Sequence, residues 1–411
     1  MSKKQPKKHR FYLYLVVAVL LVYVGLVIAK SSPTIQPDAY QKTTTLTTSS
    51  KSLPWPTTGE AAIGILGHGI LETHGKQIPL PTASTAKLIT ALCILKVKPL
   101  KPGQAGPVIT LNQNDVNILN KYDSEQGSVL PIVNGEKLTE YQMLEAMMLP
   151  SADNIADSLA IWAFGSLPNY DAYAARFVSS LGLNETTIGV DASGYSPTTI
   201  SSAKDLAQIG EMVETNPILS KIVAMPSASG FPGVGTIKNV DFLLGRNNIV
   251  GIKTGNTNQA GGVFVSASKV TVNNQPLTIV TAIDGAPDLY DALIYSQKLV
   301  VAVQQDFSVP NQISKYTKDS VVASYSEPWS GKKVNAVLQN SASMSVMNGY
   351  SVTAKLQLSA VSKQKLSGDI IGSLTLSNNL QSVKETIPVV LSGNISKPSK
   401  IWLFLHPNYV L

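Results

Sequence analysis

Residues 81–92 read PTASTAKLITAL, and this stretch contains the string Ser-Thr-Ala-Lys at 84–87. Two shorter strings follow it in order, Ser-Ala-Asp at 151–153 and Lys-Thr-Gly at 253–255. Each string alone is common in chains of this length. The ordered combination, each member in a suitable local context, is uncommon and predicts a single site assembled from three distant segments.

The first string has the context of a buried helix that begins at a serine. Pro81 stops any earlier helix, and an apolar run follows at 88–95. Residues three apart share one helical face, so the Lys87 amine is expected beside the Ser84 hydroxyl. A serine becomes a strong nucleophile when a neighbouring base takes its proton, which makes Ser84 and Lys87 candidates for nucleophile and base. The alternative is that Ser84 only caps the helix while Lys87 extends to solvent.

Charge and hydropathy indicate how the chain is placed in the cell. Residues 1–10 contain five basic residues and no acidic one, and the other 401 residues contain 28 basic and 26 acidic residues. This balance gives no reason to expect nucleic-acid binding. Residues 11–29 are uncharged and would form a helix of about 28 Å, close to the thickness of a bilayer core.

The basic cluster before this apolar stretch favours a cytoplasmic N-terminus, with everything after residue 30 outside. A single-pass membrane anchor is therefore expected, and secretion after signal-peptide cleavage is the alternative.

The single cysteine, Cys93, lies in the apolar run after Ser84, so we expect a buried thiol and no internal disulfide. The four histidines show no metal-binding spacing, and neither a metal nor an organic cofactor is expected.

The chain is long enough for two domains. Residues 30–59 are rich in Ser, Thr and Pro and are expected to form a flexible stalk. Residues 60–305 show strands, then several helices, then strands and a closing helix, with a loop-rich stretch at about 99–137. This order predicts an α+β domain with an antiparallel sheet flanked by helices. Residues 310–400 alternate polar and apolar side chains and predict a smaller all-β domain.

The chain resembles the D-alanyl-D-alanine carboxypeptidases, which are low-molecular-mass penicillin-binding proteins of the β-lactamase/transpeptidase-like fold. The resemblance is strong over about 60–305, where PTASTAKLITAL, EKLTEYQMLEAMMLPSADNIAD, DASGYSP and VGIKTGNTNQAGG resemble family segments in the expected order. It is weaker in the C-terminal domain, where GDIIGSLTL carries it. It implies action on peptidoglycan stem peptides, and binding of β-lactam antibiotics.

The resemblance also implies roles for the motif residues. Ser84 would be the nucleophile, Lys87 its base, and Ser151 would help to pass the proton to the leaving amine. Ser151 also reads as a helix N-cap, and both roles can hold. Substrate binding is implied for Asp153, Lys253, Thr254, Gly255 and Asn256. Within that set, the lysine and threonine would hold the substrate carboxylate, and the glycine would leave room for the substrate backbone. The backbone N–H groups of Ser84 and Asn256 would form the oxyanion hole.

Asp153 departs from the family pattern, in which the second motif is usually Ser-x-Asn. An ionised carboxylate only accepts hydrogen bonds and favours a charged Lys87, whereas an amide also donates. Three possibilities follow. Asp153 fills the position and changes the charge balance at Lys87, or Asp153 is partly protonated, or Asn154 takes its place. We expect Asp153→Asn to preserve or improve acylation.

The leading interpretation is a serine carboxypeptidase that removes the terminal D-Ala of stem peptides through a Ser84 acyl-enzyme. A β-lactamase-like hydrolase would share the three motifs, although such an enzyme needs neither a tether nor an additional β domain. A non-catalytic wall-binding protein is the third interpretation, and the exchange at Asp153 is the feature that favours it.

Overall fold

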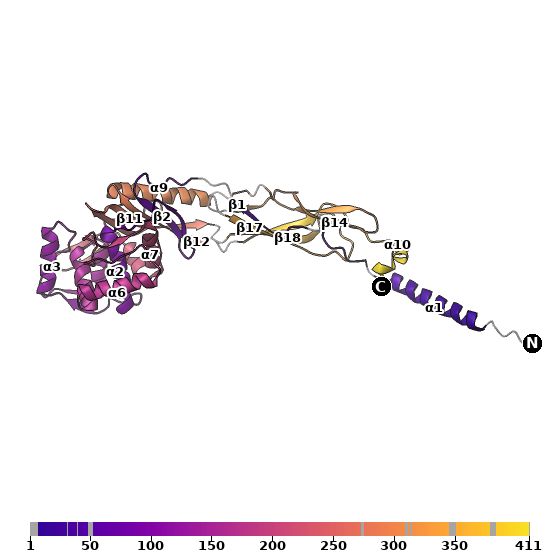
Figure 1. Ribbon diagram of the computed structural model, residues 1–411, viewed down its shortest axis with the longest axis horizontal. Coiled ribbons are helices and arrows are strands. Elements are labelled where there is room, and N and C mark those ends of the chain that lie inside the picture. Colours follow the sequence, from indigo (N-terminus) through magenta and orange to yellow (C-terminus); the bar gives the residue numbers. More distant parts are fainter. Residues whose placement is uncertain are drawn as a thin grey trace, which may run out of the picture. The chain divides into compact units, whose positions relative to one another are not determined.

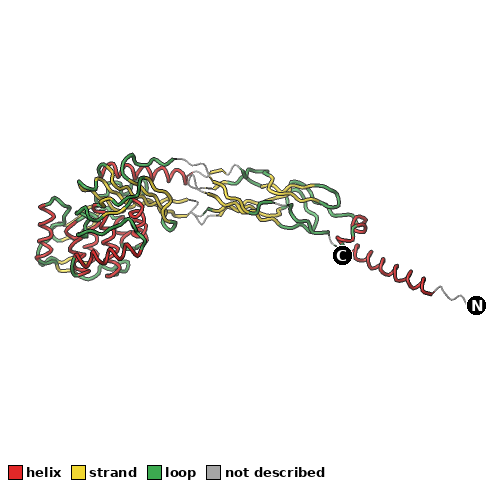
Figure 2. Tube along the Cα trace, viewed as in Figure 1, coloured by secondary structure: helices red, strands yellow, loops and turns green. Residues whose placement is uncertain are grey.

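The computed structural model describes residues 7–30, 32–38, 40–47, 52–272, 275–308, 311–312, 315–344, 351–378 and 384–410. The chain divides into two compact units, one of residues 51–308 and one formed by residues 1–50 together with 309–411. In Figure 2 the first unit mixes helices and strands, whereas most of the second unit is strand and loop.

Residues 51–308 contain the α+β arrangement that the sequence predicts. The strands of this unit are β2 (Glu60–Ile65), β3 (Gly69–His74), β4 (Leu80–Pro81), β5 (Val108–Thr110), β6 (Lys137–Thr139), β7 (Ile200–Ser201), β8 (Ser227–Phe231), β9 (Gly235–Lys238), β10 (Ile249–Thr257), β11 (Gly261–Val272) and β12 (Gln275–Ala286). The helices are the 3₁₀ turn η1 (Ala83–Thr85), α2 (Ala86–Val97), α3 (Gln113–Ser124), α4 (Glu140–Met148), α5 (Asp153–Phe164), α6 (Leu167–Ser180), α7 (Ala203–Thr215), α8 (Leu219–Val223) and α9 (Leu289–Ser308).

The central sheet has the order β10-β11-β12-β2-β3, and every neighbouring pair is antiparallel. Side chains alternate between its two faces, and the two faces are covered by different helices. Val265 of β11 contacts α7 at Gly210. The next residue, Ser266, hydrogen-bonds to Ser296 of α9 at 2.9 Å. Helices α7 and α9 therefore lie on opposite faces of the sheet (Figure 1).

Helix α2 lies inside the helical layer on the α7 side of the sheet. Ten of its twelve residues are buried, because apolar side chains occur on all its faces. Lys87 is one of the ten, and its side chain is fully buried. Cys93 is also fully buried, as the sequence predicts. The helix that carries the first motif is thus held by packing on every side.

One helix of this unit was not expected. The sequence predicts a loop-rich stretch at about 99–137, but this stretch contains α3 (Gln113–Ser124). Most side chains of α3 are polar, which hides the helical period. Its start is nevertheless marked by a capping box, in which Asn112 and Asp115 each bind the other's backbone N–H. Strands β11 and β12 form an antiparallel hairpin, and residues 273 and 274, which connect them, lie outside the described residues.

The second unit contains α1 (Lys7–Ala29) and a sheet of order β1-β17-β18-β19-β15-β14. The remaining elements of this unit are β1 (Thr43–Thr47), β13 (Asn311–Gln312), β14 (Val321–Ser326), β15 (Lys333–Leu338), β16 (Ser343–Met344), β17 (Ser351–Leu358), β18 (Ile370–Ser377), β19 (Lys384–Leu391), α10 (Lys400–Leu405) and η2 (Pro407–Tyr409). Helix α1 contains a stretch, His9–Ala29, that is long and apolar enough to cross a membrane.

The expectation of an unstructured stalk at 30–59 is wrong for part of that segment. Thr43–Thr47 forms β1 and pairs antiparallel with β17. The repeated threonines that made the segment look like low-complexity linker are β-branched and favour an extended strand. Further along, Leu53 is 6% exposed, and Trp55 stacks on His74 at 5.5 Å between ring centroids. The segment therefore contributes to both units.

Candidate active site

Ser84 lies at the start of α2, where the 3₁₀ turn η1 passes into the α-helix. Lys87 follows one helical turn later, and its Nζ donates to Ser84 Oγ at 2.8 Å. The serine side of this pair is partly exposed, whereas the lysine is fully buried. Ala83 has a φ of 46°, an unusual value for a residue with a side chain, and it orients the turn that presents Ser84.

Two further acceptors hold the Lys87 ammonium. Its Nζ donates to Asp153 Oδ1 at 2.6 Å and to the carbonyl oxygen of Ser193 at 2.9 Å. With Ser84 Oγ, these acceptors account for all three N–H bonds of an ammonium group. The first and second motifs therefore meet at this lysine, as the sequence predicts. The alternative, in which Lys87 extends to solvent, is wrong.

Asp153 uses its second carboxylate oxygen to hold a loop. Oδ2 accepts from the backbone N–H of Ser128 at 2.9 Å, and the Asp153 N–H donates to the Ser128 carbonyl at 2.7 Å. Asn154 points elsewhere: its side chain accepts from Leu130 N–H at 2.9 Å and donates to Leu130 O at 3.0 Å. Asp153 is thus the residue beside Lys87, and Asn154 fixes the loop after α3.

Ser151 lies in the short link between α4 and α5. It is 6% exposed and has a φ of 66°, in the left-handed region that is strained for a serine. Its Oγ has no hydrogen-bond partner among the described residues. The helix after it has Ala152 at the N-cap position, so Ser151 is not the cap that the sequence suggested as its structural role. A strained, buried hydroxyl without a partner is available to a reacting group.

Lys253 supplies the second cation of the site. It lies on β10, is 2% exposed, and donates from Nζ to the carbonyl of Thr254 at 3.1 Å. Burial first, and the nearby charge of Lys87 second, lower the pKa of Lys253 to about 7. This lysine therefore changes between ammonium and free amine near neutral pH.

Gly255 allows β10 to lie directly against the Ser84 turn. A Cβ at this position would be 3.1 Å from the backbone N of Ser84 and 3.1 Å from the carbonyl oxygen of Thr82. The missing Cβ therefore leaves room for the protein's own backbone, in addition to the substrate backbone expected from the sequence. The contact places the strand that carries Asn256 beside the backbone N–H of Ser84, as the expected oxyanion hole requires.

The turn at 191–196 is a part of the site whose role the sequence did not show. Asp191 Oδ1 accepts from the N–H groups of Ser193 and Gly194 at 2.9 and 2.6 Å, and Oδ2 accepts from Ser196 N–H at 2.8 Å. These bonds hold the Ser193 carbonyl against Lys87. The DASGYSP string marks a turn, but the contact is made by a backbone atom and has no signature in the side-chain sequence.

Tyr122 of helix α3 supports the turn at 191–196 through Asp157. The hydroxyl of Tyr122 donates to Asp157 Oδ2 at 2.7 Å, and Asp157 Oδ1 accepts from Ala192 N–H at 2.9 Å. Burial raises the pKa of Asp157 to about 6. Because α3 was not expected, Tyr122 was missed, although its apolar spacing from Leu119 gives a helical signal.

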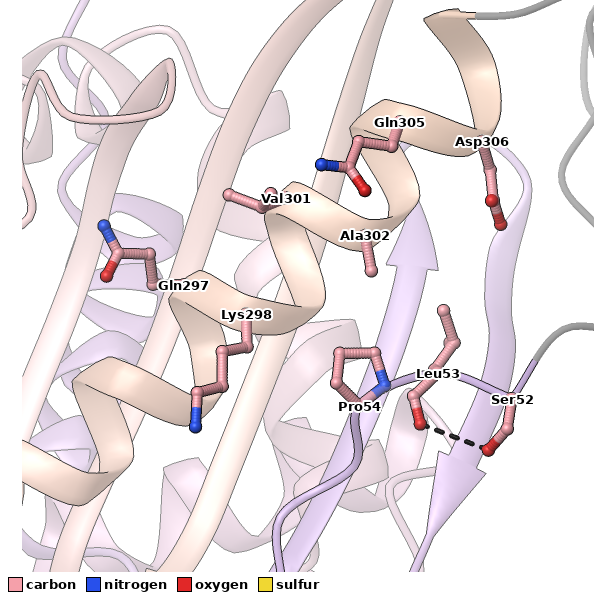
Figure 3. Close-up of a pocket in the computed structure, with 9 residues that line it drawn as sticks. All are labelled: Ser52, Leu53, Pro54, Gln297, Lys298, Val301, Ala302, Gln305 and Asp306. Carbon is pink, nitrogen blue, oxygen red and sulfur yellow. Dashed lines mark hydrogen bonds between the residues drawn. The ribbon is translucent and has the colours of Figure 1, made fainter.

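A cavity of about 550 Å³ adjoins the turn at 191–196. Its lining comes from the end of α3, the turn at 190–197 and the end of β10, and it includes Asn256. A separate cavity of about 470 Å³ lies between residues 52–54 and α9 (Figure 3), and none of the motif residues lines it. Among the described residues, no group of three or more His, Cys, Asp or Glu side chains is placed to hold a metal ion.

Comparison with solved structures defines the class of fold. The structure of penicillin binding protein 5 from Haemophilus influenzae matches with a TM-score of 0.55 and 18% identity, over 84% of this chain and 100% of that one. The α+β fold predicted from the sequence, with its antiparallel sheet flanked by helices and a C-terminal β region, is confirmed.

The chain belongs to the D-alanyl-D-alanine carboxypeptidase family, whose sequence model matches residues 66–284. It is 30% identical over 207 residues to D-alanyl-D-alanine carboxypeptidase DacB2 of Mycobacterium tuberculosis, covering 48% of this chain and 66% of that protein. It is 23% identical over 204 residues to DacA of Escherichia coli K12, covering 48% of this chain and 49% of that protein. The chain thus spans about two-thirds of the length of the first of these relatives and about half of the length of the second.

Proposed function

We propose that this protein is a serine carboxypeptidase that removes the terminal D-Ala from peptidoglycan stem peptides. The observation that carries the proposal is the contact of Ser84 Oγ with the buried Lys87 amine at 2.8 Å, beside a second buried lysine at position 253. The first pair provides a nucleophile and a base. The second lysine provides a cation for a substrate that ends in a carboxylate.

Acylation begins with a proton transfer between the Ser84 and Lys87 side chains. Lys87 acts as a free amine and takes the proton of Ser84 Oγ, which lies 2.8 Å from its Nζ. The serine oxygen bonds to the carbonyl carbon of the penultimate D-Ala. The negative charge that develops on the carbonyl oxygen is stabilised by the N–H groups of Ser84 and Asn256.

Collapse of this tetrahedral species breaks the peptide C–N bond. The leaving nitrogen takes the proton from Lys87 through the hydroxyl of Ser151, and terminal D-Ala departs. A water molecule then attacks the ester carbon while Lys87 accepts its proton, and the bond to Ser84 Oγ breaks. The proton returns to Ser84, and the shortened peptide leaves as a carboxylate after its acid proton passes to solvent.

Substrate specificity rests on β10. The Lys253 ammonium and the Thr254 hydroxyl hold the terminal carboxylate, and the cavity beside Asn256 receives the rest of the stem peptide. β-Lactams carry a comparable carboxylate and acylate the same serine. No cofactor takes part in these steps.

The apolar helix α1 supports a location of this chemistry outside the cytoplasm as part of the proposal. In the proposed topology residues 1–10 are cytoplasmic, residues 11–29 cross the membrane, and residues 60–305 act on the cell-wall side as the catalytic domain. The β domain at 310–400 forms a second exported domain. The mass of the mature protein distinguishes this anchor from a cleaved signal peptide, because cleavage removes residues 1–29.

The function is tested by two linked assays on the purified chain. Release of D-Ala from a peptide ending in D-Ala-D-Ala, together with a penicillin adduct of long lifetime, is the expected result. Rapid loss of the adduct with turnover of penicillin would instead identify a β-lactamase. Absence of both an adduct and D-Ala release would identify a non-catalytic wall-binding protein.

A further inference from the structure

A cavity lined by lysines lies where the chain leaves α1. Its volume is about 540 Å³, and it belongs to the unit formed by residues 1–50 and 309–411. The residues that line it are Lys30, Ser32, Ser362, Lys363, Gln364, Lys397, Pro398, Lys400 and Leu403. Four of the nine are lysines and none is acidic, so the lining has a formal charge of +4.

Two of the lysines join the two ends of the chain. Lys400 Nζ donates to the carbonyls of Val27 and Ile28 at 3.1 and 3.0 Å, and Lys30 Nζ donates to the carbonyl of Val410 at 3.0 Å. The last carbonyls of a helix have no partner within the helix, so Lys400 satisfies two acceptors at the end of α1. Because the acceptors are neutral carbonyls, these bonds do not neutralise the charges of the Lys30 and Lys400 ammonium groups.

The other two lysines are free to bind a ligand. Within the described part of the chain, the ammonium groups of Lys363 and Lys397 form no hydrogen bond or ion pair, and both side chains are exposed. The nearby acids are engaged elsewhere: Asp369 pairs with a different lysine, and Glu327 is 1% exposed and bonded to Ser396. A multivalent anion is therefore the natural occupant.

The surroundings of the cavity indicate that it lies at a membrane surface. The short helix α10 exposes Ile401 by 75% and Leu405 by 66%, while Leu403 packs inward against Val27 of α1. Trp402 contacts Tyr409 in a tilted arrangement, with 5.0 Å between the ring centroids. Exposed aliphatic side chains, aromatic rings and lysines together at the end of an apolar helix are the composition of a bilayer interface.

We propose that this cavity binds the phosphate of an anionic phospholipid headgroup in the outer leaflet. The inference rests on the proposed membrane anchor, because the apolar stretch of α1 ends at Ala29, next to Lys30 of the cavity. A phosphate held there would be contacted by Lys363 and Lys397, while Ile401 and Leu405 enter the acyl boundary. A soluble phosphate would gain nothing from the apolar side chains, which favours a lipid.

The test measures lipid binding to the full chain in an uncharged detergent by native mass spectrometry. Dioleoyl phosphatidylglycerol and dioleoyl phosphatidylcholine are titrated separately, and glycerol 3-phosphate serves as the soluble phosphate. We expect one phosphatidylglycerol to bind in preference to phosphatidylcholine. The double variant Lys363→Gln/Lys397→Gln should weaken phosphatidylglycerol binding by about tenfold, because each lysine near a membrane surface contributes substantially to anion binding.

The matched control is Lys318→Gln/Lys355→Gln, which removes two exposed lysines of the same unit outside the cavity. It should bind phosphatidylglycerol as the wild type does. An equal loss in both double variants, no loss in either, or equal binding of glycerol 3-phosphate and phosphatidylglycerol would overturn the proposal. Penicillin acylation should be the same in all variants, so a failure of the proposed enzymatic function would leave the lipid result unaffected.

Discussion

Asp153 accepts hydrogen bonds through both carboxylate oxygens, and both donors come from the protein. One donor is the Lys87 ammonium, and the other is the Ser128 backbone N–H. An asparagine has one acceptor oxygen, and its NH₂ group would face a second donor. A carboxylate at this position therefore satisfies both donors, whereas an asparagine would leave one of them without an acceptor.

This geometry reverses the sequence-based expectation for Asp153→Asn. We now predict that the substitution slows acylation by penicillin by about tenfold, because one buried donor loses its acceptor. The measurement is the second-order rate constant for adduct formation. Asn154→Ala is the control, and it should lower the melting temperature while the folded fraction acylates normally. A rate at or above wild type for Asp153→Asn would show that the loop and Lys87 do not need the carboxylate.

A second prediction concerns Lys253 and the pH dependence of acylation. Its pKa is lowered to about 7 by burial and by Lys87, so the free enzyme holds an ammonium there below pH 7 and an amine above it. The preference for benzylpenicillin over its methyl ester should therefore decrease as the pH rises through about 7. The ratio of the two acylation rate constants between pH 5.5 and 8.5 is the measurement. A ratio independent of pH would remove Lys253 from carboxylate binding.

At the scale of elements, the strands β2 and β12 contain a buried acidic pair. Asp284 lies directly across from Glu60 in the sheet and is fully buried. Neither oxygen of the Asp284 side chain has a hydrogen-bond partner among the described side chains and backbone groups. Burial first, and the neighbouring Glu60 second, raise the pKa of Asp284 well above its ordinary value.

The sign of the resulting pH dependence follows from proton binding. The unfolded chain loses the Asp284 proton near pH 4, whereas the folded protein retains it to higher pH, so the stability of the fold decreases as the pH rises. Asp284→Asn removes this loss. Its melting temperature should exceed that of the wild type by about 2–4 °C per kcal/mol gained at pH 8, and by less at pH 4.

The exposed Asp123, whose carboxylate forms no hydrogen bond or ion pair within the described chain, provides the control for this prediction. Asp123→Asn should shift the melting temperature equally little at both pH values. A gain for Asp284→Asn that is the same at pH 4 and pH 8 would mean that its carboxyl group does not titrate differently in the folded and unfolded states.

Sequence reasoning placed the central helices and strands because their apolar spacing is strong. It missed α3, whose polar surface hides the period, and it missed β1, whose threonines resemble a linker. In the site it brought Ser84 and Lys87 together from their spacing on one helix. It could not find the Ser193 carbonyl, which binds Lys87 across 106 positions through a backbone atom. Contacts of that kind depend on the fold and not on a local pattern.

At the scale of the whole molecule, the unit of residues 51–308 contains every motif residue and the core around α2. We predict that a chain of residues 51–308 folds and acylates with penicillin at the wild-type rate. A chain of residues 60–305, the boundaries expected from the sequence, lacks the buried Leu53 and should melt at a lower temperature. Folded 51–308 that cannot be acylated would assign the other unit a part in catalysis.

The central claim is that Ser84 is the nucleophile and that Lys87 activates it. The most direct measurement is peptide mapping by mass spectrometry after treatment of the purified protein with benzylpenicillin. We predict a penicilloyl adduct on Ser84 in the wild type, none in a folded Ser84→Ala variant, and adduct formation slowed by at least about a hundredfold in Lys87→Ala. An adduct on any other residue, or labelling that persists in Ser84→Ala, would contradict it.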